Sequence, residues 1–438
     1  MPLQWAAMGR ALAHRNYRLF IVGQGISLIG MWMQQVGLIW LVYELTGSAF
    51  LLGLVGFASQ VPTFFLAPVA GVMSDRWNRH RTLLVTQSVA MGLALVLVLL
   101  MWTGRIEVWQ VLLLGVASGV VNAFDMPTRQ SFLVDMVGRR EDLPNAIALN
   151  SSVFNAARLV GPSIAGLLIA AAGEIACFSV NALSYLAVLG ALLRMRDLPQ
   201  RPIKKHGRIW HGLAEGFVYA FGFPPIRTLL LSLSLVSLMA MPMSILMPVF
   251  ATEVLEGGPK LLGFLIGASG IGALGAALYL ASRHSVLGLG RRIAWATAVL
   301  GVGMIGFGLS RHVPLSLVLM AITGFCMMLQ MAASNTLLQT IVEDDKRGRV
   351  MSLYTMAFMG TAPLGSLLAG GIADRFGAPL AVQLGGAACI AGAALFARGL
   401  PRLREQVRPI YQQAGILPQV AVAVQTSAQL TAPPEETG

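Results

Sequence analysis

Long apolar segments alternate with short polar ones along almost the whole chain. Twelve of the apolar segments hold about 20 residues, enough for a helix rising 1.5 Å per residue to cross the hydrocarbon core of a bilayer. Lipid offers the backbone no hydrogen-bonding partners, so segments of this length are expected to be helices even where they contain Gly or Pro. The pattern predicts membrane spans at 17–43, 49–72, 82–102, 109–134, 145–171, 175–194, 225–250, 261–282, 292–310, 314–340, 350–372 and 378–398.

One polar interruption, at residues 195–224, is much longer than the others and divides the spans into six and six. The halves also resemble each other, because Gly119 and segment 131–137 align with Gly324 and segment 336–342 at a constant offset of 205. The predicted fold is an all-α integral membrane protein with twelve transmembrane helices in two pseudo-symmetric six-helix bundles. Such repeats are typical of transporters whose substrate site lies between the halves near the bilayer midplane.

The predicted organisation has five parts. They are a segment on the cytoplasmic membrane surface (1–16), the N-terminal bundle (17–194), a cytoplasmic linker with an interfacial helix (195–224), the C-terminal bundle (225–400) and a cytoplasmic tail (401–438). The tail is expected to be disordered, because it is rich in Gln, Ala, Pro and Thr and its apolar piece is too short to span a membrane.

Composition and charge exclude a soluble protein and orient the spans. Hydrophobic residues make up 56% of the 438 positions. Charged residues make up only 11%, against roughly 25% in soluble domains. The net charge of +12 would indicate nucleic acid in a soluble protein, but 24 basic residues lie on one set of loops and four on the other. By the positive-inside rule, both termini are expected on the cytoplasmic side of a bacterial-type inner membrane, with no nucleic-acid partner.

A charged motif lies between the second and third spans. Its residues Gly71, Asp75, Arg76, Arg79 and Arg81 follow the pattern G-x-x-x-D-R-x-x-R-x-R. Motif, topology and repeat together resemble the major facilitator superfamily of secondary transporters, over about residues 15–400. That resemblance implies alternating access between two rocking bundles.

Three further segments resemble one branch of this superfamily. Gly161, Pro162 and Gly166 in the fifth span resemble the Gly-Pro signature of its exporters, and imply a bend with close helix approach. Runs 125–130 and 142–150 resemble enterobactin exporters and macrolide efflux pumps. The resemblance implies export of a small amphiphilic molecule, a siderophore or a drug-like compound, by proton antiport. No cofactor is expected besides the proton gradient, and the protein is expected to be a monomer.

The charged motif is interpreted as a conformational latch. Asp75 can accept hydrogen bonds from the N-terminus of a helix in the other half, expected to be the eleventh span. Arg76, Arg79 and Arg81 would hold the acid through charge-assisted bonds. The alternative is a solvated basic turn. A second copy of the motif, at 371–377, falls on the outer side and is interpreted as a helix-ending turn.

Few charged residues lie within the spans, and each costs about 2.5–3.5 kcal/mol at the bilayer centre. Asp125 and Arg129 are four residues apart on one helical face and can pair, while Arg158 in the fifth span is an alternative partner. The pair is either a structural ion pair or the site where Asp125 takes up and releases the coupling proton. Glu44, near the outer end of the first span, is the other candidate acid.

Polar and aromatic side chains in the first and tenth spans indicate a substrate path. Trp32, Gln35 and Gln330 are the predicted pocket residues, although amides in membranes often only join helices. The sequence has no phosphate-binding loop and no metal-ligand spacing, so neither ATP nor a metal is expected. A lipid or lysolipid carrier is the alternative within the fold. A membrane-embedded acyltransferase is the alternative from another class, based on His211 and Glu215 in the linker, but the repeat argues against an enzyme.

Overall fold

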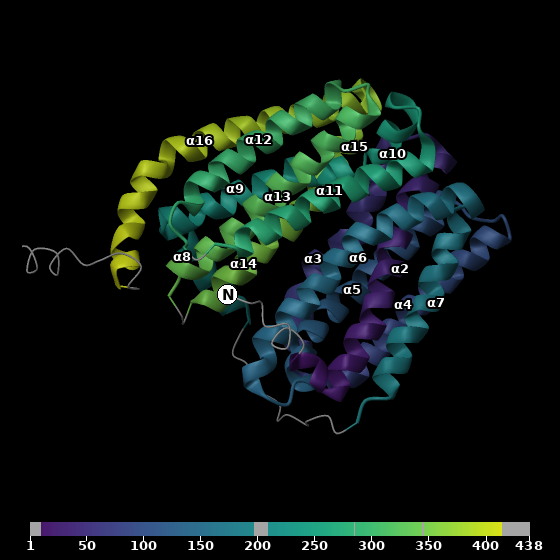
Figure 1. Cartoon of the computed structure of the whole chain (residues 1–438), viewed down its shortest axis with the longest axis horizontal. Coiled ribbons are helices and arrows are strands. Elements are labelled where there is room, and N and C mark those ends of the chain that lie inside the picture. Colours follow the sequence, from purple (N-terminus) through teal and green to yellow (C-terminus); the bar gives the residue numbers. More distant parts are fainter. Residues whose placement is uncertain (1–9, 197–208, 284, 344–345, 414–438) are drawn as a thin grey trace, which may run out of the picture.

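The structure is a computed structural model that describes residues 10–196, 209–283, 285–343 and 346–413, apart from some side chains inside helices. This described part is almost wholly helical and contains no strand. Twelve of its helical segments are long and apolar enough to cross a membrane. They form two bundles (Figure 1), so the predicted fold class is confirmed.

The N-terminal bundle consists of six unbroken helices that follow a short 3-10 turn. They are α2 (Arg15–Thr46), α3 (Ala49–Arg76), α4 (Arg79–Trp102), α5 (Val108–Met136), α6 (Leu143–Ala172) and α7 (Glu174–Leu193). Pro127 and Pro162 lie inside α5 and α6 without ending them. A bundle tolerates such prolines because neighbouring groups satisfy the carbonyl that each proline leaves without its usual donor.

In the C-terminal bundle, two spans are interrupted, which the hydrophobic pattern did not predict. The helices are α9 (Pro224–Ala240), the 3-10 turn η3 (Met241–Ser244), α10 (Met247–Val249), the π-helical turn η4 (Phe250–Val254), α11 (Gly258–Ala281), α12 (Leu289–Leu309), α13 (Val313–Ile341), α14 (Arg347–Met359), α15 (Ala362–Phe376) and α16 (Ala378–Gln413). Prolines explain both breaks, because Pro242, Pro248 and Pro363 cannot donate a backbone hydrogen bond.

The C-terminal boundary also differs from the prediction. Helix α16 continues through Pro401 to Gln413, so residues 401–413 are not a disordered tail. Apolar packing explains the extension, because Val407 is 7% exposed and belongs to the core of the C-terminal bundle. The rest of the predicted tail, the predicted surface segment 1–9 and linker residues 197–208 lie outside the described residues.

The predicted linker helix is present as α8 (Ile209–Gly222). Glu215 of α8 pairs with Arg349 of α14 at 2.8 Å, which attaches the linker to the C-terminal bundle. The His211 side chain lies outside the described residues. With Glu215 in an ion pair at the surface, the described part of α8 offers no support for the acyltransferase alternative.

Polar residues at helix starts explain where spans begin. The Ser48 hydroxyl accepts a hydrogen bond from the Leu51 N–H at the start of α3, and the Asn78 side chain accepts one from the Arg81 N–H at the start of α4. Such caps satisfy backbone donors that the first turn of a helix leaves free. Gly47 ends α2 with φ at 60°, the left-handed conformation that favours glycine.

Equivalent helix contacts recur in the two bundles at the repeat offset. Gly119 of α5 packs against the Ser59 carbonyl of α3, and Gly324 of α13 packs against the Ser269 carbonyl of α11. At both positions glycine allows the two backbones to approach more closely than a Cβ would permit. The repeat inferred from the sequence is therefore present in the packing.

The two bundles approach each other most closely at one end of the molecule (Figure 1). We call the end that carries α8 and both ends of the described chain the linker end, and the opposite end the far end. Helix α6 packs against α11, where a Cβ at Gly166 would lie 2.8 Å from the Gly263 Cα, and α3 packs against α15, where one at Gly370 would lie 3.1 Å from the Gly53 Cα. Both contacts lie toward the far end, and the bundles diverge toward the linker end.

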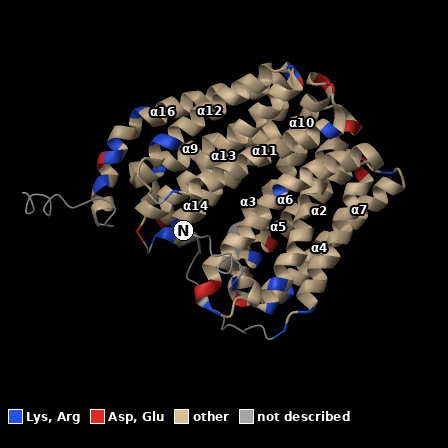
Figure 2. Ribbon diagram, in the orientation of Figure 1, with Lys and Arg blue, Asp and Glu red and all other residues tan. Residues whose placement is uncertain are grey.

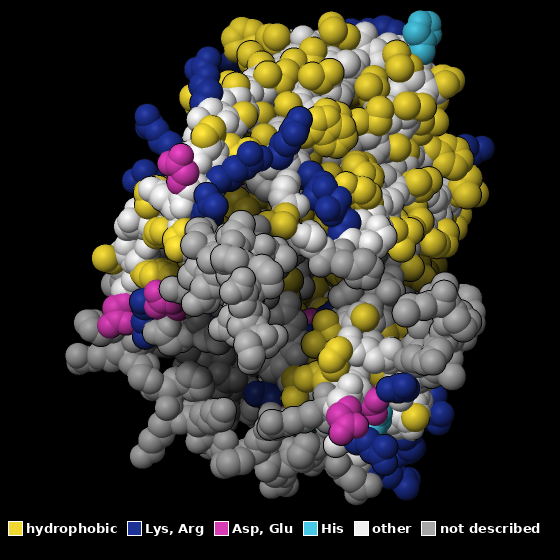
Figure 3. All heavy atoms as spheres, turned by 60° about the vertical axis from the view of Figure 1, so that its left-hand side comes forward, with side chains coloured by type: hydrophobic (Ala, Val, Ile, Leu, Met, Phe, Trp, Pro, Cys, Tyr) yellow, Lys and Arg dark blue, Asp and Glu magenta, His cyan; other side chains and the backbone are white. Residues whose placement is uncertain are grey.

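Charged residues gather near the ends of the helices, and the middle parts carry few of them (Figure 2). Around the linker end, Lys and Arg are spread over the surface, while hydrophobic side chains cover the flank of the molecule (Figure 3). Leu183 of α7 and Val302 of α12 are 64% and 61% exposed. A broad apolar surface between charged ends fits the hydrocarbon core of a bilayer.

Candidate functional site

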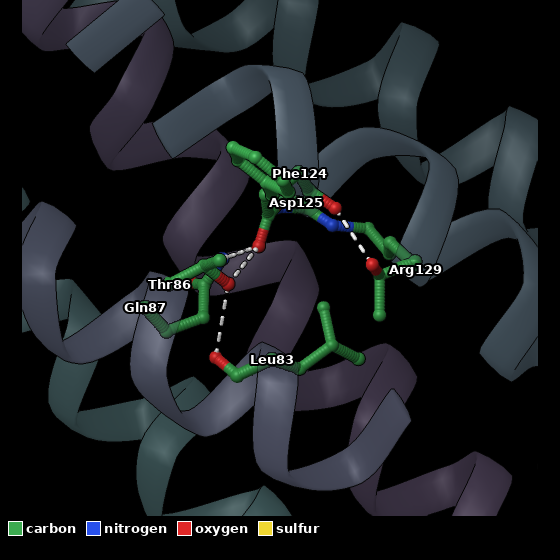
Figure 4. A network of polar contacts seen from close by, with 7 residues as sticks. Leu83, Thr86, Gln87, Phe124, Asp125 and Arg129 are labelled. Carbon is green, nitrogen blue, oxygen red and sulfur yellow. Dashed lines mark hydrogen bonds and ion pairs between the residues drawn. The ribbon is translucent and has the colours of Figure 1, made fainter. Parts of the chain in front are cut away.

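A carboxylate lies inside the N-terminal bundle, surrounded by donors from two helices (Figure 4). Asp125 of α5 is 3% exposed. Its Oδ1 accepts hydrogen bonds from the Thr86 hydroxyl at 2.8 Å and from the Gln87 amide at 2.7 Å, both on α4. Its Oδ2 pairs with Arg129, one turn further along α5. The predicted Asp125–Arg129 pair is therefore present, together with two neutral donors that the sequence analysis missed.

The Thr86 hydroxyl has two acceptors within reach and only one proton. Its oxygen lies 2.8 Å from Asp125 and 3.2 Å from the Leu83 carbonyl, one turn back on α4. An ionised Asp125 favours the shorter bond, because hydrogen bonds to charged groups are stronger. If Asp125 takes up a proton, the Thr86 hydroxyl can turn to Leu83 and still donate. The network therefore offers Thr86 an acceptor in either protonation state of Asp125.

A polar cavity of about 90 Å³ adjoins this carboxylate. Its lining comes from α2, α4, α5 and α7 and is rich in amides, which are Gln24, Gln34, Gln87, Asn122 and Asn181. A cavity of this size and polarity has room for a few water molecules, with several polar partners for each. Asp125 therefore has a polar surrounding although it lies within an apolar bundle.

Arg158 lies apart from the Asp125 network. Its guanidinium carbon is 5.9 Å from the centre of the Trp32 ring, and Trp32 packs edge-on against Phe154 with ring centres 6.0 Å apart. A cation over an aromatic face contributes about 0.5–2 kcal/mol, depending on how far it is desolvated. The partner of Asp125 is Arg129, so the alternative pairing of Asp125 with Arg158 is wrong.

The corresponding position in the C-terminal bundle is uncharged. At the repeat offset of 205, Asp125 and Arg129 correspond to Gln330 and Ser334. Both are 0% exposed on α13. Neither the Gln330 amide nor the Ser334 hydroxyl has a hydrogen-bond partner among the described residues. Gln330 is therefore enclosed among packed helices, whereas Gln35, another predicted pocket residue, is exposed on α2.

The charged motif is joined to α5 by one of its arginines. Arg79, at the start of α4, donates hydrogen bonds to the Ser131 carbonyl at 3.2 Å and to Asp135 at 2.9 Å. The Asp135 side chain is only 7% exposed. Asp135 was not predicted as a functional residue, although an acid at the end of a span near a basic motif is a usable signal. Arg81 of the motif is exposed.

The other motif residues cannot be placed in the same way. Neither the surroundings of Gly71 nor the side chains of Asp75 and Arg76 are among the described parts of the structure. The proposed latch from Asp75 to the eleventh span therefore stays a prediction.

At the far end, an acid of one half binds the start of a helix in the other half. Asp374 of α15 accepts a hydrogen bond from the Ser48 hydroxyl at 3.0 Å, and its carboxylate lies 3.5 Å from the Phe50 nitrogen in the first turn of α3. The free N–H groups and the dipole of a helix N-terminus favour a carboxylate. The Tyr43 hydroxyl of α2 also donates to Glu253 in the other half. We call these four side chains, Ser48, Asp374, Tyr43 and Glu253, the far-end clasp.

The clasp adds a role to the segment 371–377. This segment does end α15, because the Gly377 N–H bonds to the Ala373 carbonyl. Its interpretation as a turn missed the contact that Asp374 makes with the other half. The resemblance to the charged motif was a signal for that contact, since Asp374 stands at the end of its span, as the motif's acid is predicted to do, and binds the start of a helix in the other half.

The Gly-Pro segment lies where α6 contacts both α2 and α11. A Cβ at Gly161 would lie 2.6 Å from the Trp32 Cβ, and one at Gly263 of α11 would lie 2.7 Å from the Pro162 carbonyl oxygen. The close approach predicted for this segment is therefore present. Pro162 also has no N–H to donate to the Arg158 carbonyl.

Glu44 lies at the far end of α2 and is exposed. It is separate from the cavity lining around Asp125. Of the two candidate acids, only Asp125 lies buried inside a bundle.

Comparison with known proteins agrees with this arrangement. Residues 7–428 match the family described as transmembrane secretion effector. The chain belongs to this family of the major facilitator superfamily. The family assignment suggested by the charged motif is thereby confirmed, and the protein is a multi-pass membrane transporter of the efflux or secretion type.

Curated relatives include both drug and siderophore transporters. The multidrug efflux pump Tap of Mycolicibacterium fortuitum is 32% identical over 374 residues, which cover 81% of this chain and 87% of the relative. The staphyloferrin A transporter of Staphylococcus aureus is 25% identical over 370 residues, which cover 82% of this chain and 90% of the relative. The macrolide efflux protein A of Streptococcus pyogenes is 25% identical over 370 residues, with coverages of 81% and 88%.

Solved structures share the fold. A bacterial homologue of the human lysosomal transporter Spinster, in an inward-facing and unoccupied conformation, has a TM-score of 0.68 at 14% identity and covers 91% of this chain and 98% of its own. A bacterial homologue of the iron transporter ferroportin, in an inward-facing state, has a TM-score of 0.65 at 17% identity, with coverages of 88% and 98%. At these identities the likeness shows the fold alone.

Proposed function

We propose that this protein exports a small amphiphilic molecule, a drug-like compound or a siderophore, across a bacterial inner membrane in exchange for protons. The observation that carries the proposal is the buried Asp125, with its Arg129 partner, two neutral donors and an adjoining polar cavity. An ionisable group at this depth is costly and therefore marks a functional site by default. The two acceptors of Thr86 accommodate a carboxylate that gains and loses a proton.

Asp125 carries the coupling proton in this proposal. When ionised it holds Arg129 through a charge-assisted bond, and protonation weakens that bond because the carboxylate loses its charge. Transport is coupled to protons if the two protonation states favour different arrangements of the bundles. The location of the pair inside one bundle then makes that bundle the one that senses the proton.

The linker end is the cytoplasmic end in this proposal, because the positive-inside rule places the basic loops and both termini there. The structure is then closed toward the outside and open toward the cytoplasm. Alternating access separates the contacts of α3 with α15 and of α6 with α11, and closes the linker end, where the Asp75 latch is predicted. The transporter works as a monomer and uses no cofactor besides the proton gradient.

Inside-out vesicles with an acidic lumen test the proposal. A panel of anionic, neutral and cationic fluorescent dyes is offered, and uptake of at least one dye is expected only while the pH gradient lasts. Collapsing the gradient with an ionophore serves as the control in the same vesicles. If every dye that is taken up is still taken up after the gradient has collapsed, proton antiport is contradicted. The assignment as an efflux transporter is not affected by that result.

A further inference from the structure

The exposure of α6 shows which way its side chains face. Successive residues of a helix are rotated by about 100°, so one stripe of α6 contains residues 147, 151, 154, 158, 161, 165 and 169. Toward the far end this stripe is buried, with Ala165 at 0% and Ile169 at 5% exposed. Toward the linker end it is open, with Ile147 at 50% and Phe154 at 40% exposed.

A second stripe of α6 identifies the lipid side. Val160, Ile164 and Leu167 are 41%, 40% and 49% exposed, although they lie beside the closed far end. A face that is exposed even where the bundles touch is turned toward lipid. The stripe with Phe154 and Arg158 points the other way, into the space that opens between the bundles.

Arg158 lies where this stripe changes from buried to exposed. Gly270 of α11 is close to it, since a Cβ there would lie 3.5 Å from the Arg158 carbonyl oxygen. Further toward the linker end, the glycines Gly272 and Gly275 of α11 face Ala321 and Phe325 of their own bundle instead. Arg158 therefore stands at the apex of the opening, where the contact of α6 with α11 ends.

The apex carries a positive charge that no described carboxylate neutralises. Among the described residues, no carboxylate pairs with the Arg158 guanidinium, while Asp125 is already paired with Arg129. The indole N–H of Trp32, beneath the guanidinium, is buried and has no acceptor in the described part of the chain. The Arg158 guanidinium and the Trp32 indole N–H thus stand next to the aromatic rings of Trp32 and Phe154. Such a set of groups matches an anionic group attached to an apolar or aromatic body.

We propose that Arg158, Trp32 and Phe154 form the subsite that binds the anionic group and adjacent ring of an amphiphilic anion. This proposal deepens the proposed function and rests on it, because it names the chemical class of the exported substrate. Arg158 supplies the charge and Trp32 a neutral donor, while Phe154 contacts the apolar body. Arg158 thus determines specificity, and its role is separate from the proton site at Asp125.

Two dyes that differ only in their charged group test the subsite. The anion 8-anilinonaphthalene-1-sulfonate and the neutral N-phenyl-1-naphthylamine share one ring system. Their binding to the purified full chain in nanodiscs of zwitterionic lipid is measured by energy transfer from protein tryptophans, with empty nanodiscs subtracted. Arg158→Gln is expected to raise the Kd of the sulfonate about tenfold or more and to leave that of the neutral dye within about twofold, since a charge-assisted bond is lost.

Two further variants complete the test. Arg158→Lys keeps the charge and is expected to retain most of the sulfonate affinity. Arg227→Gln makes the same charge change on an exposed residue at the start of α9 and is expected to bind both dyes like the unaltered protein. The proposal is overturned if Arg158→Gln leaves the sulfonate affinity unchanged or weakens both dyes equally. If that variant does not fold, weak sulfonate binding by folded Arg158→Lys overturns it instead. Binding needs no pH gradient, so these outcomes are independent of whether proton antiport holds.

Discussion

The two bundles share their helix packing but differ in charge at one repeat-related position. Gly119 and Gly324 pack α5 and α13 against their neighbours in the same way. Yet α5 carries the ion pair of Asp125 and Arg129, whereas α13 carries Gln330 and Ser334, which are buried without partners in the described structure. The repeat therefore preserves the shape of the helix contacts and not their chemistry. In the proposed antiport, one titratable site in one bundle is enough for a cycle in which both bundles move together.

The two ends of the molecule show a related contrast. At the far end, Asp374 of the C-terminal bundle binds the start of α3 in the N-terminal bundle. At the linker end, Asp75 of α3 is predicted to bind the start of the eleventh span, which is α14. The same two spans would thus supply an acid to each other at opposite ends. Since alternating access requires one end to open as the other closes, the two contacts would then form in turn.

The largest effect is expected at the ion pair of the N-terminal bundle. Asp125→Asn removes the proposed proton site but keeps the side-chain shape and two polar atoms. Uptake driven by a pH gradient into inside-out vesicles is expected to fall at least about tenfold, because the repeat-related residue in the C-terminal bundle is the uncharged Gln330, which cannot take over the proton. Glu256→Gln, the same kind of change on an exposed loop residue, serves as the control. If a well-folded Asp125→Asn protein still shows proton-coupled uptake, then Asp125, the residue that distinguishes the two bundles, is not the coupling site.

The contact between the bundles is expected to give the next largest effect. Gly166→Leu places a side chain where a Cβ alone would lie 2.8 Å from the Gly263 Cα, so α6 and α11 have to separate. Uptake is expected to fall about tenfold, because far-end closure is lost. A cysteine introduced at Ser163 is expected to react faster with an impermeant maleimide added from the outside.

Two features of the chain make this labelling experiment specific. The native cysteines Cys177, Cys326 and Cys389 are buried. Gly190→Leu in α7 is the matched control, because a Cβ there would meet nothing within 4 Å. If Gly166→Leu changes neither uptake nor labelling, the glycine contact does not hold the far end closed.

These contrasts show what the sequence could predict. Asp125 and Arg129 were paired correctly, because residues four apart on a helix are neighbours whatever the tertiary structure. Thr86 and Gln87 were missed, since their contact with Asp125 depends on how α4 packs against α5. The positions of proline did not predict where a span is interrupted, because Pro127 lies in an unbroken helix while Pro363 follows a break. Which outcome applies depends on the surrounding groups that replace the lost hydrogen bond.

A smaller effect is expected where the charged motif meets α5. Arg79→Gln removes the charge that holds the buried Asp135, and is expected to destabilise the protein by about 1–3 kcal/mol. The measurement is thermal unfolding in detergent, followed by tryptophan fluorescence. Arg81→Gln, an exposed arginine of the same motif, is expected to change stability by less than about 0.5 kcal/mol. Equal losses for both variants would mean that general charge, and not the Arg79–Asp135 contact, stabilises this end of the bundle.

The smallest effect is expected at Gln330, the uncharged position of the C-terminal bundle. The same change, Gln to Leu, can be made at Gln87 in the N-terminal bundle for comparison. Gln87→Leu removes a donor from Asp125 and is expected to destabilise the protein by about 1.5–3 kcal/mol and to reduce proton-coupled uptake. Gln330→Leu removes an amide without partners among the described residues, so stability should stay the same or rise by about 1 kcal/mol, with uptake within about twofold. If Gln330→Leu instead abolishes uptake at unchanged stability, Gln330 binds the substrate, as the predicted pocket requires. The C-terminal bundle would then contribute to substrate recognition alongside the proposed Arg158 subsite, while the N-terminal bundle carries the proposed coupling site.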